Sequence, residues 1–204
     1  MDDSFVKSLV GSALHHTSNW TWVFIALCIA GFVFQNITSL WIYLAFFPRV
    51  AFRAPWMFIT SIFLHADLSH LFFNIVALFF FGTSLERLLG RRVFPILFLS
   101  SGVIGNIGYL ITDPASRIPA IGASGAIYGV IGALATLEPF ALVYIYGFFP
   151  LPLIVAAALW VLIDLVGLFA PSEVAHGAHL GGMVVGVIFG IYYRILFSRV
   201  RIPG

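Results

Sequence analysis

Three short segments carry polar side chains that could do chemistry in an otherwise apolar chain. The first is IGASGAIYG, residues 121–129, in which Ser124 lies between small residues. The others are HADLSHLFFN, residues 65–74, and AHGAHLGG, residues 175–182. A serine hydroxyl is a weak nucleophile until a neighbouring base removes its proton, and histidine titrates near neutrality. These residue types predict acyl transfer, with Ser124 as the nucleophile and His179 as the base.

Acyl transfer passes through a tetrahedral intermediate whose oxyanion needs hydrogen-bond donors. The start of a helix offers free backbone N–H groups backed by the helix dipole, so we expect donors around Gly122 and Ser124. His70 and Asn74 are spaced i, i+4 and project from one helix face, so their side chains can add donors. No third-member carboxylate with a clear geometry is evident, and we therefore expect a Ser–His dyad. Tyr128, one turn after Ser124, can hold the imidazole by stacking.

The composition predicts that these segments lie in a membrane. Of the 204 residues, 61% are hydrophobic and 9% are charged, and the mean hydropathy is +1.07. A soluble domain carries about 25% charged residues, so the deficit indicates an integral membrane protein surrounded by lipid. The net charge is +2 and the basic residues form no long run, which gives no indication of a nucleic-acid partner. The single Cys28 excludes an intrachain disulfide.

The apolar runs predict one bundle of six helices. A helix needs roughly 20 residues to cross a hydrocarbon core of about 30 Å, and prolines, glycines and charged residues mark the breaks between runs. The fourth run is short, because its 14 residues span only about 21 Å. Glu138 and Pro139 favour this short form over a kinked continuation, and residues 140–149 are then expected at the membrane interface. The expected helices cover residues 20–47, 67–89, 93–112, 124–137, 151–169 and 176–197.

The distribution of Lys and Arg predicts the orientation of the bundle. Seven of the ten basic residues lie on the N-terminal segment, the second and fourth connections and the C-terminal tail, and three lie on the opposite side. Cytoplasmic segments carry an excess of Lys and Arg, so both termini are expected in the cytoplasm. The expected location is the plasma membrane. We expect a cytoplasmic segment over residues 1–19, a membrane domain over 20–197 and a cytoplasmic tail over 198–204.

With this orientation, the second, fourth and sixth helices all begin on the outer side, where the active site is expected to open. Ser124, His179 and the pair of His70 and Asn74 then lie at one depth. Stripes of small residues let helix backbones approach closely in lipid. Two such stripes predict contact between the fourth and sixth helices, and they consist of Gly125, Gly129 and Ala133, and of Gly182, Gly186 and Gly190.

These residues resemble the rhomboid family of intramembrane serine proteases. The match lies in GASG around Ser124, in HADLSHLFFN, and in AHLGG around His179, in that order on six expected spans. The resemblance implies an all-α membrane protein, a rhomboid-like bundle of six transmembrane helices with a short central fourth helix. It also implies Ser124 as nucleophile, His179 as base, His70 and Asn74 at the oxyanion, and Tyr128 packed on His179.

The same resemblance implies features outside the site. Glu86 and Gly90 are expected in a structural turn after the second helix. The implied partners are single transmembrane helices of substrate proteins, with a small residue at the cleaved bond, and no cofactor or metal is implied. Arg53 and Trp56, in FRAPW, are the nearest match to a Trp–Arg pair that the family often carries in a long first loop. His176 has no role assigned by the resemblance.

Each polar residue also has a structural interpretation. Ser124 could be a small packing residue, and His179 or Asn74 could be a hydrogen-bond partner between helices. Intramembrane ionisable residues are nevertheless functional candidates by default. We expect Asp164 to be a solvated or capped carboxylate about one turn from the outer boundary, and His65 to be a loop or capping residue.

Three rival classes of function remain. A rhomboid-like protein that binds or escorts membrane helices without cleaving them is the main alternative, although such a protein would be expected to lose the serine or the histidine. A small-solute transporter would need broken-helix repeats, which are not visible. A zinc enzyme lacks an HExxH motif and a placed carboxylate base, and its ligands would be His65, His70, His176 and His179.

Overall fold

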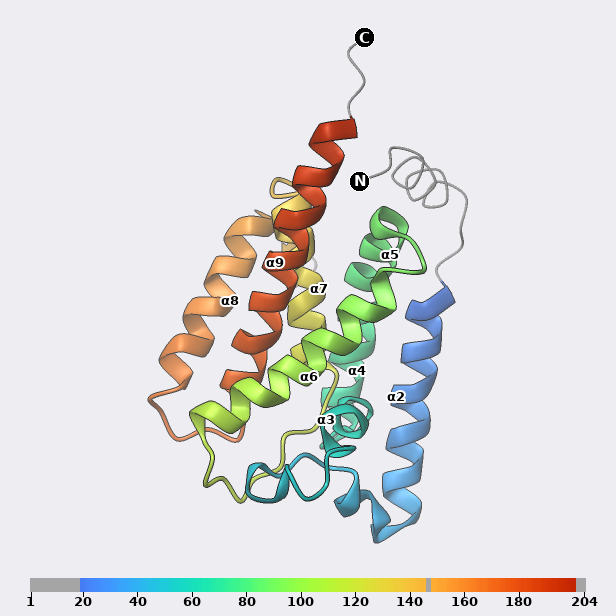
Figure 1. Ribbon diagram of the computed structural model, residues 1–204, viewed down its shortest axis with the longest axis vertical. Coiled ribbons are helices and arrows are strands. Elements are labelled where there is room, and N and C mark those ends of the chain that lie inside the picture. The colour runs from blue at the N-terminus through green and yellow to red at the C-terminus, as the bar shows by residue number, and fades with distance from the viewer. Residues whose placement is uncertain (1–18, 146–147, 201–204) are drawn as a thin grey trace.

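The computed structural model describes residues 19–145 and 148–200 and is a bundle of helices (Figure 1). Four helices in this described part are long and apolar enough to cross a membrane, and two apolar helices are shorter. The long ones are α2 (Asn19–Ile37), the composite helix Leu68–Leu89, α6 (Phe94–Thr112) and α9 (His176–Val200), and the shorter ones are α7 (Ser124–Leu137) and α8 (Leu153–Gly167).

The expected helical membrane bundle is confirmed, whereas six complete crossings stay a prediction. The division into a segment over 1–19, a membrane domain over 20–197 and a tail over 198–204 also stays a prediction. Residues 1–18 and 201–204, which carry nearly all of the first segment and most of the tail, lie outside the described residues.

The first helix is shorter than expected, so the predicted range 20–47 was wrong at its C-terminal end. α2 ends at Ile37, and Thr38 adopts an extended backbone with φ −150°. Its hydroxyl accepts a hydrogen bond from the N–H of Leu40 at 3.2 Å. A threonine that bonds the local backbone in this way competes with helical hydrogen bonding. The chain continues in short turns, η1 (Ser39–Tyr43), η2 (Pro48–Val50), α3 (Met57–Thr60) and η3 (Ser61–Phe63).

These turns form the first connection, which holds the FRAPW segment. Arg53 is exposed there, and Trp56 is also exposed while its indole N–H donates to the carbonyl of Tyr43 at 2.8 Å. The connection is tied to the segment before α7, because Phe46 and Ala120 exchange two backbone hydrogen bonds. The Trp56 side chain therefore bonds within the first connection, to the backbone of Tyr43.

The second helix has the expected bounds but a changed pitch at its centre. It consists of α4 (Leu68–Ala77), a π-helical turn η4 (Leu78–Gly82) and α5 (Thr83–Leu89). Glu86, near its end, is 4% exposed. The turn that follows contains Gly90 at φ 79°, a conformation that glycine adopts without steric cost.

The Glu86 carboxylate connects the end of the second helix to the beginning of α2. Oε1 accepts the N–H of Trp20 at 2.9 Å, and Oε2 accepts both the N–H and the hydroxyl of Thr21, at 2.9 and 2.8 Å. The first N–H groups of a helix have no intrahelical partner, and a negative charge beside them is stabilising. The turn expected at Gly90 is thus confirmed, whereas Glu86 lies in α5, just before this turn.

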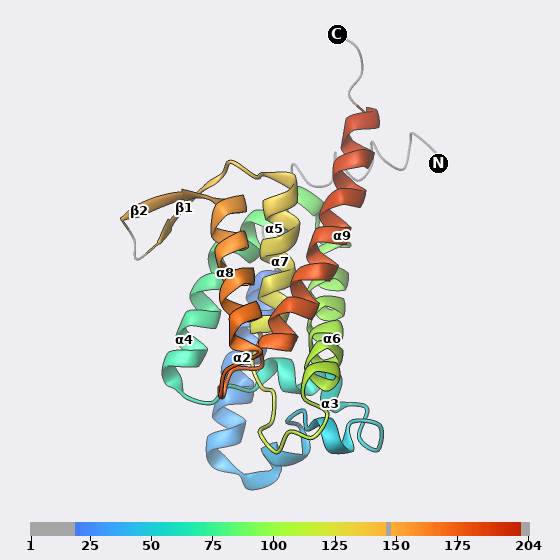
Figure 2. The ribbon, with the colours of Figure 1, turned by 90° about the vertical axis from the view of Figure 1, so that its left-hand side faces the viewer.

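α7 is the central element of the bundle, and none of its residues is exposed. It packs against α6, α8, α9 and η4, and both ribbon views show it enclosed (Figures 1 and 2). A Cβ atom added to Gly182 would lie 1.9 Å from the carbonyl oxygen of Gly125, and one added to Gly186 would lie 1.9 Å from that of Gly129. The predicted contact between the small-residue stripes is therefore confirmed.

The bounds of α7 are those expected from the sequence. Glu138 ends the helix with φ −126° and ψ 62°, so the chain does not continue as a kinked helix through Pro139. An antiparallel hairpin follows, in which β1 (Leu142–Ile145) pairs with β2 (Phe149–Pro152) and projects sideways in Figure 2. Its exposed apolar side chains suit the interfacial position predicted for residues 140–149, of which 146 and 147 lie outside the described residues.

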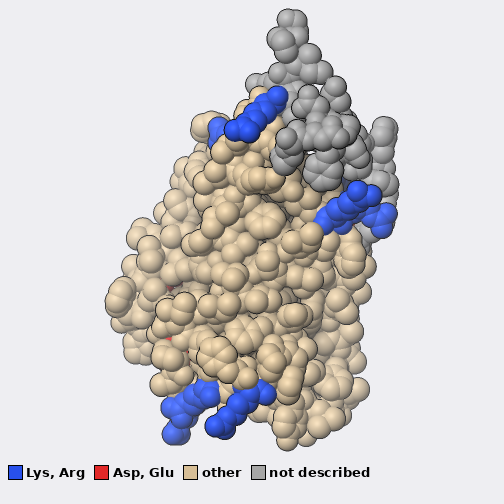
Figure 3. Space-filling view, viewed as in Figure 1, with Lys and Arg blue, Asp and Glu red and all other residues tan. Residues whose placement is uncertain are grey.

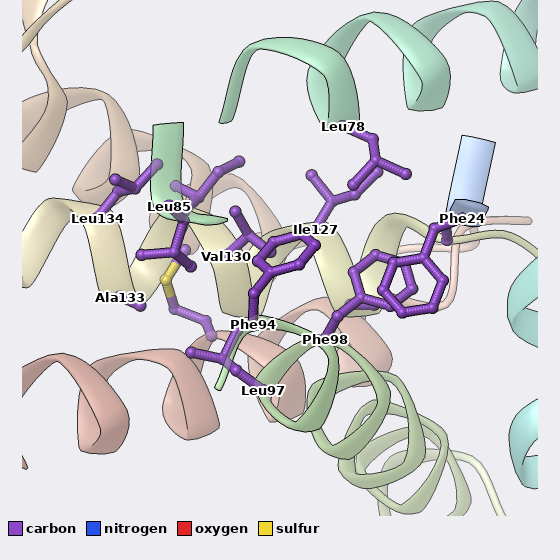
Figure 4. Packing of buried hydrophobic residues seen from close by; sticks show 14 of the residues in the cluster. Phe24, Leu78, Leu85, Phe94, Leu97, Phe98, Ile127, Val130, Ala133 and Leu134 are labelled. Atoms are coloured by element: carbon purple, nitrogen blue, oxygen red, sulfur yellow. The ribbon is translucent and has the colours of Figure 1, made fainter. Parts of the chain in front are cut away.

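Aromatic side chains fill the space between α2, α6 and α7. Phe24 of α2 stacks on Phe98 of α6, with ring centroids 4.2 Å apart. Ile127 and Val130 of α7 belong to the same buried cluster (Figure 4). The surface in Figure 3 shows basic side chains at two ends and, between them, a wide band that is almost free of charged side chains. Such a band suits contact with the hydrocarbon core of a bilayer.

Candidate active site

Three helix starts position the polar segments. α4, α7 and α9 all begin toward the same end of the bundle (Figures 1 and 2). Ser124 is the first residue of α7, and His179 lies in the first turn of α9. The Oγ of Ser124 and the Nε2 of His179 are 2.9 Å apart, which is hydrogen-bond distance. The structure thus brings together the two residues for which the sequence predicts catalysis.

Gly122 shapes the entry into α7. Its φ of 120° is one that residues with a side chain rarely adopt, and a Cβ atom there would lie 2.7 Å from the ring of His70. Its N–H donates to the carbonyl of Ser61 at 3.0 Å. The turn therefore aims the start of α7 at the site and leaves the His70 imidazole directly beside the chain that carries Ser124.

The His179 ring is held on one face by Tyr128. The two ring centroids lie 4.2 Å apart with an interplanar angle of 11°, which is a stacked pair. Tyr128 lies one turn after Ser124 on α7, so the same helix supplies the hydroxyl and the surface that restrains the imidazole. The stacking expected from the sequence is present.

His70 and Asn74 occupy different situations. The Nδ1 of His70 accepts the N–H of Ala66 at 3.4 Å, so a neutral ring carries its proton on Nε2, which faces Gly122. The side-chain amide of Asn74 donates to the carbonyl of His70 at 2.8 Å, within its own helix. Asp67 caps this helix by accepting the N–H of His70 at 2.8 Å. His70 therefore presents a donor to the site, whereas one of the two N–H groups of Asn74 is used locally.

A carboxylate that the sequence did not identify contacts His179, so the expected Ser–His pair has an acidic neighbour. Asp164 of α8 is 2% exposed, so it is not the solvated carboxylate that was one of the two expectations from the sequence. Its Oδ1 lies 2.9 Å from the Nδ1 of His179 and 2.6 Å from the Nδ1 of His176. The sequence did carry a signal, since Asp164 is the only charged residue of α8 and a buried carboxylate needs donors.

His65 lies in the connection before α4, as expected of a loop residue, and its side chain is fully buried. Its ring meets that of His70 edge to face at 5.1 Å. Its backbone N–H donates to the side-chain oxygen of Gln35 at 2.9 Å, and its carbonyl accepts the amide of the same side chain. Burial, with a smaller contribution from charge on His70, lowers the pKa of His65 to about 4.

A small cavity of about 20 Å³ lies beside Ser124. Its lining includes Asn106, Gly122 and Gly125, and the amide of Asn106 donates to the hydroxyl of Ser61 at 2.9 Å. A volume of this size is sufficient for about one water molecule. The site therefore has room for a solvent molecule next to the nucleophile.

One cluster of side chains near the site could hold a metal ion. Within the described residues, donor atoms gather in Asp164, His176 and His179, whose ligand atoms all lie within 4.8 Å of one another. The zinc interpretation of the sequence relied on a different set, in which His65 and His70 join the two histidines of α9. The hydrogen bonds of Asp164 account for the observed cluster.

Comparisons with known proteins match the chain to one family. Residues 52–195 match the family model described as Rhomboid domain. The chain is 29% identical over 198 residues to "Rhomboid protein 1, mitochondrial" of Saccharomyces cerevisiae, which covers 91% of this chain and 56% of that protein. It is 32% identical over 175 residues to "Rhomboid protease GluP" of Bacillus subtilis, which covers 82% of this chain and 33% of that protein.

A third relative is "RHOMBOID-like protein 12, mitochondrial" of Arabidopsis thaliana, which is 33% identical over 160 residues and covers 70% of this chain and 47% of that protein. The chain therefore spans between about a third and a little over half of the length of these curated relatives. The matched family region contains all of the site residues described above.

Proposed function

Because the chain belongs to the rhomboid family, we propose that it is an intramembrane serine endopeptidase that cleaves transmembrane helices of membrane-protein substrates near the outer face of the membrane. The observation that carries the proposal is the 2.9 Å contact between the Ser124 hydroxyl and the His179 imidazole within a membrane bundle. A nucleophile within hydrogen-bond reach of a base is the signature of covalent acyl transfer. Several relatives are themselves named proteases.

In the first half of the reaction, the Oγ of Ser124 attacks the carbonyl carbon of the substrate peptide. The Nε2 of His179 accepts the hydroxyl proton as the new C–O bond forms. The oxyanion is stabilised by backbone N–H groups at the start of α7, by the Nε2–H of His70 and by the remaining N–H of Asn74. Loss of a single donor of this kind typically costs about 2.7–4 kcal/mol of transition-state stabilisation.

In the second half, the same imidazole returns the proton to the leaving amine, and the C–N bond breaks. Water then attacks the acyl-enzyme, with His179 as the general base, and the product acid leaves Ser124 free. The cavity beside Ser124 is a suitable store for that water, because it adjoins the nucleophile and is lined partly by polar groups.

The substrate helix is proposed to enter beside α8 and to unwind locally before cleavage. α8 carries exposed apolar side chains over much of its length, including Leu159, Leu162 and Ile163. It meets the second helix through an edge-to-face contact of Trp160 with Phe81, whose ring centroids lie 6.3 Å apart. Motion of α8, or of the connection over residues 168–175, would open this side.

The protein is a multi-pass membrane protein, and we propose the plasma membrane as its location with both termini in the cytoplasm. The asymmetry of Lys and Arg supports the orientation, since seven of the ten lie on the proposed cytoplasmic side. Several relatives, including two of those described above, are named mitochondrial. Localisation by microscopy of a tagged chain distinguishes these membranes.

A serine-reactive fluorophosphonate probe tests the proposed function. Wild type, Ser124→Ala and His179→Ala are purified in detergent, labelled, and assayed on a model transmembrane substrate. We expect labelling and cleavage in the wild type and neither in the two variants. Ser100→Ala is a matched control, because this hydroxyl donates to the carbonyl of Leu97 within its own helix, α6.

Cleavage that persists in Ser124→Ala refutes the assignment of the nucleophile. Wild-type protein that is folded but neither labelled nor active supports the alternative function of a helix-binding or escort protein. Activity that is lost with a chelator and kept in Ser124→Ala supports a metal enzyme.

A further inference from the structure

A single carboxylate oxygen connects the proposed base to a second histidine. The Oδ1 of Asp164 is 2.9 Å from the Nδ1 of His179 and 2.6 Å from the Nδ1 of His176. Asp164 comes from α8, and the two histidines are three residues apart at the start of α9, so they lie on the same helix face. The Asp164 side chain is 3% exposed, and those of the histidines are 13% and 14% exposed. The contact is therefore a shielded junction between two helices.

The chemistry of the atoms determines the direction of these hydrogen bonds. A carboxylate accepts hydrogen bonds and cannot donate them, so each Nδ1 must carry the proton that it shares with Asp164. A neutral His179 with its proton on Nδ1 has a lone pair on Nε2. That lone pair faces the Ser124 hydroxyl at 2.9 Å. This tautomer is the one in which His179 can accept the proton of Ser124.

His176 repeats the arrangement on the other side of the carboxylate. Its Nδ1 contacts Asp164, and its Nε2 lies 3.0 Å from the Oγ of Ser172 in the connection between α8 and α9. A buried carboxylate is unfavourable unless hydrogen bonds satisfy it, and two N–H donors on one oxygen favour the charged form. The donor from His176 remains in place while His179 changes its protonation state during the reaction.

We propose that Asp164 is a positioning residue that fixes the tautomer and orientation of His179 and stabilises its positively charged form, and that His176 holds Asp164 in place for this task. The inference rests on the proposed function of Ser124 and His179. Ser124, His179 and Asp164 then form a Ser–His–Asp triad, and His176 contacts Asp164 as a fourth member. In the acylation step the Ser124 proton moves to Nε2 of His179, the Nδ1 proton stays on His179, and Asp164 remains ionised throughout.

Steady-state cleavage of a transmembrane substrate in detergent micelles tests the first half of the proposal. Asp164→Asn removes the charge and replaces the carboxylate with an amide, which has one acceptor oxygen and an NH₂ donor. We expect kcat to fall at least tenfold while KM changes less than threefold, because the Asp164 side chain is 3% exposed and offers substrate almost no surface. Asp113→Asn is the matched control, since Asp113 is exposed at the end of α6 and should keep wild-type kcat.

Substitutions at His176 test the second half. Asn at this position can still donate an N–H to Asp164, so His176→Asn should keep kcat within threefold of wild type. His176→Phe keeps a ring of similar shape without a donor and should lower kcat about fivefold or more. Equal activity of the Phe and Asn variants overturns the holding role of His176.

A spectroscopic measurement reads the tautomer directly. In ¹⁵N-histidine-labelled protein carrying Ser124→Ala, the nitrogen shifts of His179 at alkaline pH should show the proton on Nδ1. The same measurement with Asp164→Asn added should show a shift of population toward Nε2–H. A proton found on Nε2 with Asp164 intact overturns the proposal, even if Asp164→Asn fails to fold.

The outcomes separate this inference from the proposed function. If Ser124→Ala abolishes cleavage while folded Asp164→Asn keeps kcat within threefold of wild type, the positioning role is refuted and the protease function stands. If Ser124→Ala still cleaves substrate, the proposed function fails first, and the inference about Asp164 fails with it.

Discussion

Gly122 is the residue whose backbone conformation gives α7 its starting direction. It has φ 120°, and any Cβ atom there would lie 2.7 Å from the His70 ring. Gly122→Ala should therefore lower kcat/KM at least about 100-fold. The substitution strains the turn, and its Cβ atom displaces the His70 ring, which is an expected oxyanion donor. Cleavage assays measure this loss.

A matched variant separates the local effect from a general one. Gly90→Ala also replaces a glycine with positive φ, at 79°, but it lies in the turn after α5. We expect that variant to lower thermal stability with a smaller change in kcat/KM per folded molecule. Equal kcat/KM losses in the two variants would argue against a specific role for Gly122.

His65 makes stability depend on pH in a defined direction. Burial lowers its pKa to about 4 from an ordinary value of 6.5. Between these two pH values the unfolded chain binds a proton that the folded chain does not, so stability decreases as the pH falls through this window. From pH 7 to pH 5 the loss attributable to His65 is about 2 kcal/mol.

Thermal unfolding in detergent, compared between wild type and His65→Gln, measures this dependence. The Gln variant should show a smaller decrease in Tm between pH 7 and pH 5, because its side chain does not titrate. Parallel Tm curves for the two proteins over this range would exclude His65 as the source.

Among the elements, α7 and α9 lie so close that their glycines leave no room for a side chain. A Cβ atom on Gly186 would lie 1.9 Å from the carbonyl oxygen of Gly129, so a side chain requires the helices to separate. Gly186→Val should destabilise the protein by about 3 kcal/mol, and also lower kcat by pulling His179 away from Ser124. Ile188→Val, on an exposed position of the same helix, should change Tm little. Unchanged stability of Gly186→Val would show that the contact is not tight in the membrane.

The sequence was sufficient to predict the contact between Ser124 and His179. It was not sufficient to predict the contact of Asp164 with His179. The asymmetry of Lys and Arg predicted that α4, α7 and α9 begin at one depth. The stripes of small residues predicted that α7 and α9 approach closely. α8 is apolar on every side apart from Asp164, so no periodic pattern indicates which face it turns toward α9. Only the packed structure supplies that rotation and the two hydrogen bonds that follow from it.

The end of the first helix illustrates a second limit of sequence reasoning. The apolar run continues past Thr38 through WIYLAFF, so hydropathy alone favours a longer helix. The local hydrogen bond from Leu40 to the Thr38 side chain ends it earlier. Such competition involves a single side chain and is not visible in a window of some 19 residues.

At the scale of the whole molecule, the two charged ends define a testable orientation. Arg117 lies in the third connection and Arg91 in the second, and both are exposed. In intact cells, a membrane-impermeant maleimide should label Arg117→Cys and leave Arg91→Cys unlabelled until the cells are lysed. The native Cys28 is fully buried and should give little background. The reverse labelling pattern would place both termini outside.

The enclosure of α7 affects which peptide bond of a substrate helix is cleaved. The nucleophile belongs to a helix that meets protein and not lipid, so its height is fixed by neighbouring helices and not by the acyl chains around the bundle. A visiting helix has no such support, and it rises or tilts with the thickness of the surrounding lipid. Reconstitution into vesicles of longer-chain phospholipid should therefore shift the scissile bond along the substrate. Ser124 stays at a fixed height in the bundle, while the substrate helix moves relative to it.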